Sequence, residues 1–416
     1  MTGSGRRLGL WEGTGVELEY MIVDRDTLDV RPLCDRVLEA AAGRIVSEVE
    51  RGRLAWSNEL VLHVLEFKTN GPAPTLRGLG GLFARSVREA NEILTEMGAR
   101  LMPTAMHPWM DPLKETVLWP HEYSPVYEAY DRIFGCGGHG WSNLQSAHLN
   151  LPFADDPGFG KLHAAARLVL PLLPGLAASS PVVEGRPARW LDSRMEFYRN
   201  NSRRIPSVAG DVIPEPVLSR AAYVKEVLEP MWQDVAPYDP EGVLRDEFLN
   251  SRGAIARFGR GSLEIRVIDM QECPAADLAV AALTVAACRL MAEGDPGPPA
   301  DESRTTQATL VEVLRRTVEA ADGAVVDDGT YLAELGLDGG RASVGDIWRH
   351  LLVAAEGRGL LDDPEASSIA RRLLDRGPLA RQILRSLGVA PWSREALRAV
   401  FRELCDCLSN DELFLP

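Results

Sequence analysis

Carboxylates at alternate positions of an apolar run are the feature that most constrains this chain. Residues Gly15 to Tyr20 read Gly-Val-Glu-Leu-Glu-Tyr. In a β-strand, Glu17 and Glu19 would share one face about 7 Å apart, with the apolar residues on the other face. Two like charges on a half-buried strand are costly unless a cation lies between them, and Mg²⁺ prefers oxygen ligands. A solvated strand face would show the same pattern, so this pair alone does not decide between the two.

Two further apolar runs carry polar pairs at the same spacing. His148 and Asn150 alternate with apolar residues in one run, and Glu264 and Arg266 do so in the other. The repetition favours one sheet with a packed face and an ionisable face. We expect the ionisable face to form the floor of a site made of Glu17, Glu19, His148, Asn150, Glu264 and Arg266.

Residues 59–66, Glu-Leu-Val-Leu-His-Val-Leu-Glu, predict a fourth strand with a carboxylate at each end. Glu59 and Glu66 are an odd number of positions apart, so a regular strand cannot present both on one face. We expect either a bulge or Glu59 at the strand entrance, and Glu66 is the better candidate ligand. By the same parity His63 faces away from Glu66, which favours a buried core histidine.

The segments, in their order along the chain, resemble the glutamate–cysteine ligase superfamily, in particular its bacterial second family, the carboxylate–amine ligases. The set spans about residues 10–290 and is more specific than any single motif. The matching stretches are Gly15-Val16-Glu17-Leu18-Glu19, Asn58-Glu59-Leu60 through Glu66-Phe67-Lys68-Thr69-Asn70-Gly71-Pro72, Met106-His107-Pro108, Ser146-Ala147-His148-Leu149-Asn150, Ser202-Arg203-Arg204-Ile205-Pro206 with Ala209-Gly210, and Leu263-Glu264-Ile265-Arg266.

The resemblance implies an α+β fold like that of glutamine synthetase. A curved antiparallel sheet would form a funnel-shaped active site, with helices packed behind it. It also implies an ATP-dependent ligase that phosphorylates the γ-carboxylate of glutamate and then lets an amine displace the phosphate to form an amide. Cysteine is the default amine by family name, which would place the reaction in glutathione biosynthesis.

The resemblance also assigns roles to individual residues. Two or three Mg²⁺ ions, with Mn²⁺ as an alternative, would bridge the phosphates of the co-substrate ATP. Their expected ligands are Glu17, Glu19, Glu59, Glu66, His148 and Glu264. Arg266 would steady the transferring phosphoryl group, with Glu66 as its catalytic neighbour, because phosphoryl transfer needs positioning and charge neutralisation. The expected ATP- or substrate-binding residues are Lys68, Asn150, Arg194, Arg199, Arg203 and Arg204, although a solvated loop would also account for the four arginines.

One departure from the second family's pattern leaves the substrate open. Many members read His-x-His where this chain has His148-Leu149-Asn150. The alternatives are therefore a ligase for another amine or carboxylate in a specialised pathway, or a catalytically silent nucleotide-binding homologue. A phosphotransferase on a guanidino group is a weaker alternative. Retention of the carboxylates together with Arg266 argues against the silent homologue, because unused buried charges destabilise a fold.

Composition narrows the class of protein and its partners. The net charge of −15 argues against nucleic-acid binding, and the first residues contain no apolar signal segment. The longest apolar run, 278–291, is too short to span a bilayer and is expected to be a core helix. Six scattered cysteines indicate reduced thiols. We expect a cytoplasmic enzyme with small-molecule substrates, no membrane contact and possible homo-oligomerisation.

The chain is expected to divide at a Gly/Pro-rich linker, residues 294–299. Residues 1–293 would form the catalytic unit, and 300–416 a helical C-terminal region packed on it or continuing it. Helices are predicted over 75–99, 161–179 (broken at its prolines), 274–292, 310–321, 344–355, 367–374 and 393–408, with a strand over 100–105.

Two short motifs are expected to have no independent chemistry. Cys136-Gly-Gly-His139 offers half of a zinc site without a second half, and is expected to be a glycine-rich loop at the edge of the active site. Residues 158–161, Gly-Phe-Gly-Lys, lack the spacing of a phosphate-binding loop and are expected to be a plain turn.

Overall fold

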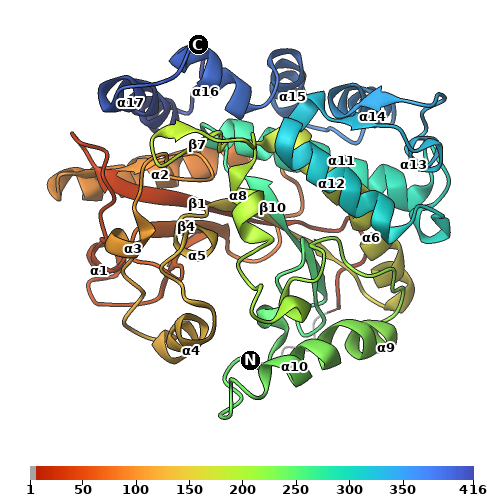
Figure 1. Ribbon diagram of the computed structural model, residues 1–416, viewed down its shortest axis with the longest axis horizontal. Helices are drawn as coiled ribbons and strands as arrows, with labels where there is room; N and C mark the ends of the chain where they lie inside the picture. Colours follow the sequence, from red (N-terminus) through yellow and green to blue (C-terminus); the bar gives the residue numbers. More distant parts are fainter. Residues whose placement is uncertain (1–5) are drawn as a thin grey trace.

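One open, eight-stranded antiparallel sheet organises the computed structural model, which describes residues 6–416 (Figure 1). This confirms the predicted α+β class. The strands in spatial order are β2 (Glu48–Arg51), β3 (Leu54–Asn58), β4 (Val64–Thr69), β1 (Gly15–Asp24), β6 (Ser146–Pro152), β10 (Ser262–Asp269) and β9 (Ala254–Arg257), with β5 (Ala99–Met102) beside the second half of β1. Two small hairpins, β7 (Val182–Val183) with β8 (Arg186–Pro187) and β11 (Val325–Val326) with β12 (Ala342–Ser343), lie outside this sheet.

The central strand β1 has the two predicted faces. Its even-numbered residues, Val16 to Ile22, are fully buried in the main hydrophobic core. The odd-numbered face begins with Glu17 and Glu19 and continues as Met21 and Val23, which belong to a second apolar cluster shared with α17. The ionisable face is therefore confined to one half of the strand, where the sheet is open to a site.

The strand predicted over residues 59–66 is wrong. The chain leaves the sheet after Asn58 and returns at Val64, so Glu59 lies in the connection between β3 and β4. The intervening peptide groups pair instead with a neighbouring segment: Leu62 N–H donates to the Val117 carbonyl at 2.9 Å. Glu59 and Glu66 therefore do not belong to one strand, and the odd number of positions between them no longer prevents both side chains from facing the same site.

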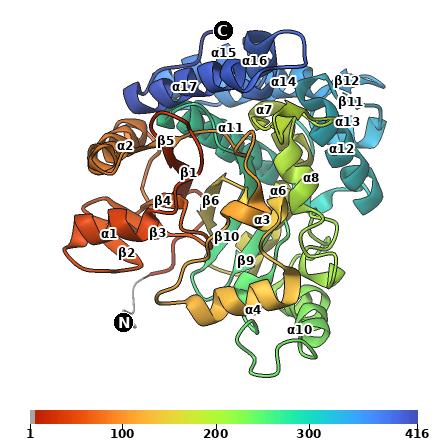
Figure 2. The same cartoon turned by 60° about the vertical axis from the view of Figure 1, so that its left-hand side comes forward.

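Helices cover the apolar face of the sheet. The two long ones, α2 (Leu79–Glu96) and α11 (Pro274–Glu293), lie against each other and carry a second layer of C-terminal helices (Figures 1 and 2). That layer contains α12 (Gln307–Ala320), α13 (Gly329–Glu334), α14 (Val344–Gly357), α15 (Pro364–Arg376), α16 (Leu379–Leu387) and α17 (Arg394–Asn410). The remaining helices are α1 (Cys34–Ala42), α3 (Pro112–Glu115), α4 (Ser124–Phe134), α5 (His139–Ser142), α6 (Asp156–Val169), α7 (Leu173–Ala177), α8 (Ser193–Tyr198), α9 (Arg220–Tyr223) and α10 (Glu229–Val235).

The predicted helices are confirmed with shifts of a few residues at their ends. The helix expected over 161–179 is α6 followed by a 3-10 turn and α7, and the interruption falls at its prolines. Several shorter helices lie outside the predicted ranges, among them α13 and α16 in the C-terminal region. A helix of six to nine residues shows too few turns of apolar periodicity to be recognised from the sequence. The division into two domains stays a prediction, and one hydrophobic core runs across the proposed boundary.

The apolar helix and the thiols are both buried. Within the described residues, α11 alone is long and apolar enough to cross a membrane by length and composition. In this helix, 78% of an apolar 18-residue stretch is buried inside the protein. This is the packing of a core helix, as predicted. All six cysteines are buried and free, as expected for reduced thiols.

The first turn of α11 is fixed to the central strand by a buried carboxyl group. Asp277 Oδ2 accepts a hydrogen bond of 2.7 Å from the Tyr20 hydroxyl, and its Oδ1 accepts one of 2.7 Å from Gln271 N–H. All three residues are at most 1% exposed. The bond therefore sets how the main covering helix sits on the strand that carries Glu17 and Glu19.

Tyr20→Phe should lower the free energy of unfolding by about 1–3 kcal/mol, because it leaves a buried carboxyl oxygen of Asp277 without its donor. Urea denaturation measures the change. Tyr238→Phe, at a tyrosine that is 38% exposed, is the matched control and should change stability by less than about 0.5 kcal/mol. Equal effects of the two substitutions would contradict the role given to this bond.

Candidate active site

The strand register brings ionisable side chains together on one face of the sheet. Glu17 on β1 lies directly opposite Lys68 on β4 and His148 on β6. Glu19 lies directly opposite Glu66 of β4. Because directly paired residues of antiparallel strands share a face, these side chains form two adjoining rows. The predicted convergence of Glu17, Glu19 and His148 is confirmed.

A third row lies beside them and depends on a glycine. Gly15 is paired with Asn150 of β6, and Asn150 is paired with Glu264 of β10. A Cβ atom at Gly15 would lie 2.9 Å from the Cβ of Asn150, so a side chain there would displace the asparagine. The glycine leaves Asn150 Nδ2 free to donate to Glu17 Oε1 at 2.9 Å.

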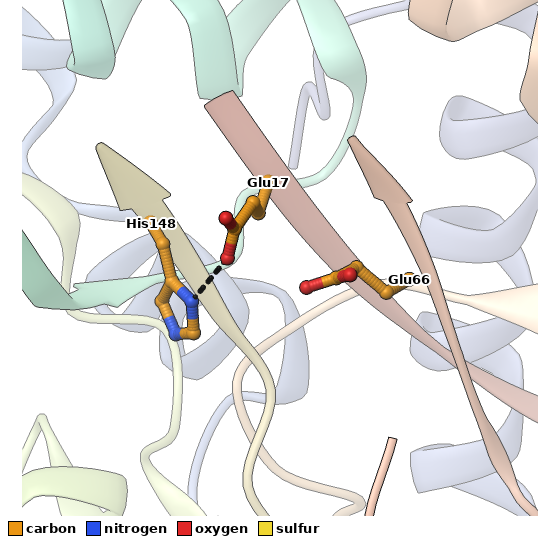
Figure 3. Close-up of side chains that lie close together, drawn as sticks. All are labelled: Glu17, Glu66 and His148. Carbon is orange, nitrogen blue, oxygen red and sulfur yellow. Dashed lines mark hydrogen bonds and ion pairs between the residues drawn. The ribbon is translucent and has the colours of Figure 1, made fainter. Parts of the chain in front are cut away.

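Two overlapping groups of side chains have the composition of a divalent-cation site. One consists of Glu17, Glu66 and His148, and the other of Glu19, Glu59 and Glu66. In each group one ligand atom per residue lies within 4.8 Å of the others. The first group comes from three adjacent strands, with the carboxylate of Glu66 turned toward Glu17 (Figure 3). Carboxylate oxygens with one imidazole suit Mg²⁺ or Mn²⁺, and the shared Glu66 suits a pair of ions.

Hydrogen bonds orient the ligand atoms. Glu17 Oε2 lies 2.9 Å from His148 Nδ1, and the other ring nitrogen lies 2.9 Å from the Ser146 hydroxyl. Glu19 Oε2 accepts from Ser146 N–H at 2.8 Å. The Ser57 hydroxyl donates to Glu66 Oε1 at 2.5 Å. Such outer contacts hold ligand carboxylates in place before an ion binds.

Without a cation, ionisation of most carboxylates in the two groups is unfavourable, and their pKa values are raised. Burial raises the pKa of Glu59 well above its usual value, and it also raises the pKa of Glu19. Burial and the neighbouring Glu17 carboxylate raise the pKa of Glu66 to about 7. Burial also opposes the ionisation of Glu17 and the protonation of His148, but their mutual contact outweighs it. The pKa of Glu17 falls to about 2 and that of His148 rises to about 9.

Glu264 belongs to neither group of candidate ligands. Arg257 Nη1 donates to its carboxylate at 3.2 Å, and Arg266 Nε lies 3.7 Å from its other oxygen. Its predicted role as a metal ligand stays a prediction, whereas its observed partners are two arginines. Glu59 does reach the second group, from the connection between β3 and β4.

Two cavities flank the carboxylates on the ionisable face. The basic cavity, of about 550 Å³, is lined by Arg6, Arg7, Glu17, Glu48, Lys68, Asn150, Arg260 and the turn 69–72, among others. The aromatic cavity, of about 400 Å³, is lined by Glu19, Glu59, Ser146, His148, Arg194, Asn201, Ser251, Arg266 and an apolar wall that includes Tyr123, Tyr127, Tyr130, Trp141, Tyr198 and Phe248. A third cavity, of about 390 Å³ between α2, α11 and α15, contains none of the candidate ligands.

The cavities separate the predicted binding residues into two sets and leave some out. Lys68 and Asn150 line the basic cavity, and Arg194 lines the aromatic one. Three arginines line neither: Arg199, Arg203 and Arg204. They are exposed, and Arg199 pairs with a glutamate of its own helix turn. Their predicted role stays a prediction without support from their positions.

Sequence reasoning missed two parts of the site. One is Asp269, whose Oδ1 lies 2.5 Å from Arg194 Nε and fixes that arginine, although both residues are almost fully buried. The sequence around Asp269 does not mark it as a site residue, because its role depends on a contact between β10 and α8, which are far apart in the chain. The other is the aromatic wall. Here a signal was available: residues 123, 127, 130 and 134 are all aromatic at helical spacing on α4 and the residue before it.

The structure confirms the predictions for the Cys136–His139 loop and for His63 and corrects the one for residues 158–161. Gly140 and Trp141, just after the Cys136–His139 motif, line the aromatic cavity, so this loop borders the site. His63 is fully buried, its Nε2 lies 2.7 Å from the Ser142 carbonyl, and burial lowers its pKa to about 4. Residues 158–161 form part of α6 rather than a turn, which corrects that prediction.

Known proteins resemble this chain along nearly its whole length. The model of glutamate-cysteine ligase family 2 matches residues 14–403. An uncharacterized protein of Archaeoglobus fulgidus is 30% identical over 401 residues, which cover 96% of this chain and 100% of the relative. A protein of Rubrobacter xylanophilus, provisionally named glutamate–cysteine ligase 2-3, is 27% identical over 297 residues, covering 68% of this chain and 71% of the relative.

Solved structures resemble it in fold. A glutamate–cysteine ligase from Francisella tularensis, in complex with AMP, superposes with a TM-score of 0.59 at 12% identity, covering 96% of this chain and 88% of that one. A bifunctional glutathione synthetase from Pasteurella multocida superposes with a TM-score of 0.58 at 15% identity. The match covers 97% of this chain and 52% of the synthetase.

The metal-free protein should become less stable as pH rises from 5 to 8. Glu66, with a folded-state pKa near 7, keeps its proton in the folded state after the unfolded chain has lost it near 4.5, so folding is favoured below pH 7. As pH rises through 7 this contribution is lost, by up to about 3 kcal/mol for the shift of this group. His148, with a pKa near 9, changes stability in the same direction.

Urea denaturation in EDTA, at pH values between 5 and 8, measures this dependence. Glu66→Gln removes the Glu66 contribution and should flatten the curve relative to the unchanged protein. Added Mg²⁺ should stabilise the unchanged protein more at pH 8 than at pH 6, because the cation competes with the proton. If stability depends on pH in the same way in both proteins, the pKa of Glu66 is not raised in the folded state.

Proposed function

The chain belongs to glutamate–cysteine ligase family 2, and we propose that it is an ATP-dependent carboxylate–amine ligase that activates a carboxylate as an acyl phosphate. Glutamate, through its γ-carboxylate, is the first candidate for the acid. Cysteine is the default amine by family name alone. The proposal includes the cytoplasmic location expected from the sequence.

The observation that carries the proposal is a carboxylate cluster placed between two cavities of different character. The basic cavity offers Lys68, Arg260 and Asn150, the kind of lining that a polyphosphate requires. The aromatic cavity offers space for an acceptor on the other side. A phosphoryl group that passes from one cavity to the other must cross the cluster. The AMP bound to the Francisella tularensis enzyme supports a nucleotide as the first substrate.

The candidate cation ligands fit this role. Glu17, Glu66 and His148 would hold one Mg²⁺, and Glu19, Glu59 and Glu66 a second. When bound, the ions supply positive charge that neutralises the phosphate oxygens and allows nucleophilic attack on phosphorus. The protein's own contribution is to align these carboxylates through hydrogen bonds from Ser57 and Ser146 and through the contact with the His148 ring.

The reaction then balances in two steps. An oxygen of the substrate carboxylate attacks the γ-phosphorus of ATP, the bond to the β-phosphate oxygen breaks, and ADP leaves. The amine nitrogen attacks the acyl carbon, the carbon–oxygen bond to phosphate breaks, and the amide, inorganic phosphate and a proton are released. We expect Arg266, which lines the aromatic cavity, to contact the acceptor and the phosphoryl group during transfer.

The geometry of Arg266 favours the catalytic role over a structural one. Its Nε is buried without a hydrogen-bond partner, and its distance of 3.7 Å to the Glu264 carboxylate is too long for a hydrogen bond. Among the described residues its guanidinium makes one hydrogen bond, from Nη1 to the Asn250 carbonyl, and at 3.4 Å this bond is long. An arginine with a purely structural role would be expected to satisfy its donors within the fold.

Hydroxylamine should intercept the acyl phosphate and give a hydroxamate only when ATP, Mg²⁺ and the correct carboxylate are all present. The assay uses glutamate and a panel of other amino acids and dicarboxylic acids, with and without EDTA. Phosphate release without hydroxylamine, measured across a panel of amines, then identifies the second substrate. ATP binding without hydroxamate from any acid would favour the silent homologue. Phosphate that stays on the product would favour the phosphotransferase.

Arg266→Lys should lower kcat by about 100-fold or more, because lysine keeps the charge but loses the planar fork that contacts a phosphoryl group. The KM for ATP should change much less, since the contact strengthens chiefly in the transition state. Arg372→Lys, at an exposed arginine of α15 that lines neither cavity, is the control and should leave kcat unchanged. A near-normal kcat with a lowered melting temperature for Arg266→Lys would assign it a structural role.

A further inference from the structure

The wall of the aromatic cavity is unusual for this chain. Four of its lining residues are tyrosines, whereas the whole sequence has eight, and Trp141 and Phe248 add two more rings. The rings pack on one another around Tyr130, whose centroid lies 5.2 Å from that of Trp141 and 6.5 Å from that of Phe248. The remaining apolar lining is aliphatic and includes Leu60, Val126 and Leu144.

The polar groups of Tyr127, Tyr130 and Trp141 are hydrogen-bonded within the protein, whereas the buried Tyr198 hydroxyl has no hydrogen-bond partner among the described residues. The Tyr127 hydroxyl accepts from Asn58 Nδ2 at 3.0 Å, and the Tyr130 hydroxyl donates to the Phe248 carbonyl at 3.4 Å. Trp141 Nε1 donates to the backbone carbonyl of Asn201 at 3.2 Å. These three rings, together with Phe248, therefore offer a ligand mainly ring surface. A flat apolar group would bury that surface favourably, whereas a small polar side chain would find few partners on it.

Arg194, one of two arginines that line the same cavity, has an unused donor besides the one on Arg266. Arg194 is 1% exposed, and its Nε is held by Asp269 at 2.5 Å. Its Nη2 is buried and has no hydrogen-bond partner within residues 6–416. A buried guanidinium nitrogen without an acceptor is costly unless a ligand supplies one, and a carboxylate oxygen is its natural partner.

We propose that the substrate in the aromatic cavity is a carboxylate joined to an aromatic ring, with the ring on the wall formed by Tyr127, Tyr130, Trp141 and Phe248 and the carboxylate on Arg194 Nη2. The inference rests on the proposed ligase function and specifies its substrate class. Two sources share this chemistry. An aromatic amino acid would be the amine, and an arylalkanoic acid would be the activated acid.

Isothermal titration of the full chain in EDTA, without ATP, tests the recognition by itself. The probes are 3-phenylpropionate, L-phenylalanine, phenethylamine, glutamate and cysteine. The two probes with both a ring and a carboxylate should bind at least tenfold more tightly than phenethylamine, glutamate or cysteine. Equal binding of phenethylamine would overturn the role of Arg194, and tighter binding of glutamate or cysteine would overturn the role of the wall. Adenosine serves as a competitor, and displacement of 3-phenylpropionate would overturn the assignment of the cavity.

Two substitutions locate the binding. Val126→Glu places a carboxylate in the wall and should weaken binding of 3-phenylpropionate at least tenfold. Val353→Glu, at a valine that is 68% exposed on α14, is its matched control and should bind as the unchanged protein does. Arg194→Lys keeps the charge and loses the second donor, so it should remove the preference for 3-phenylpropionate over phenethylamine. Unchanged binding in Val126→Glu would place the ligand elsewhere.

Turnover separates this inference from the proposed function. Hydroxamate from 3-phenylpropionate alone would identify the activated acid, whereas phosphate release with glutamate plus L-phenylalanine would identify the amine. Hydroxamate from glutamate without any preference for ring-bearing probes would overturn the substrate class and leave the ligase standing. Tight binding of the ring-bearing carboxylates without hydroxamate from any acid would overturn the ligase and leave the binding site standing.

Discussion

Mutual repulsion of carboxylates at the centre of the sheet is the constraint on which the rest of the structure depends. Glu17, Glu19 and Glu66 sit on adjacent strands with their side chains on one face, where burial makes ionisation costly. Two positive charges offset part of this cost. They are protonated His148, which contacts Glu17, and Lys68, whose ammonium lies 3.2 Å from the Glu66 carboxylate. Under the proposed function, a divalent cation would neutralise the negative charge that remains.

A face with such unfavourable charge needs a rigid support, and the opposite face supplies it. The apolar side of β1 is fully buried against the main core, and the Tyr20–Asp277 bond ties that strand to α11. Of the C-terminal helices, α14 and α15 pack on α11 and α17 packs on α2 (Figure 2). Ligand groups built on paired strands hold their geometry better than groups on loops, and here only Glu59 comes from a connection.

The two cavities divide the chemistry of the site. Basic residues and a glycine-containing turn border one side of the carboxylates, and aromatic rings border the other. An arrangement of this kind suits a reaction in which a strongly charged donor meets a less polar acceptor across a charged partition. Under the proposed function, substitutions in the aromatic wall would change the acceptor without altering the strands that carry the candidate cation ligands.

The sequence by itself determined the sheet, its two faces and the helix that covers it, because period-2 and period-3.6 patterns are local properties of the chain. It also identified Glu17, Glu19, Glu66 and His148, whose chemistry is readable from alternation and from family resemblance. Only the tertiary structure decided that the chain between Asn58 and Val64 leaves the sheet, since its peptide groups pair with a segment more than fifty residues away. Only the tertiary structure, likewise, separated the buried arginine of the aromatic cavity from its exposed neighbours. Arg194 lines the cavity because Asp269 of β10 holds it there, and the spacing of the arginines in the sequence does not predict this contact.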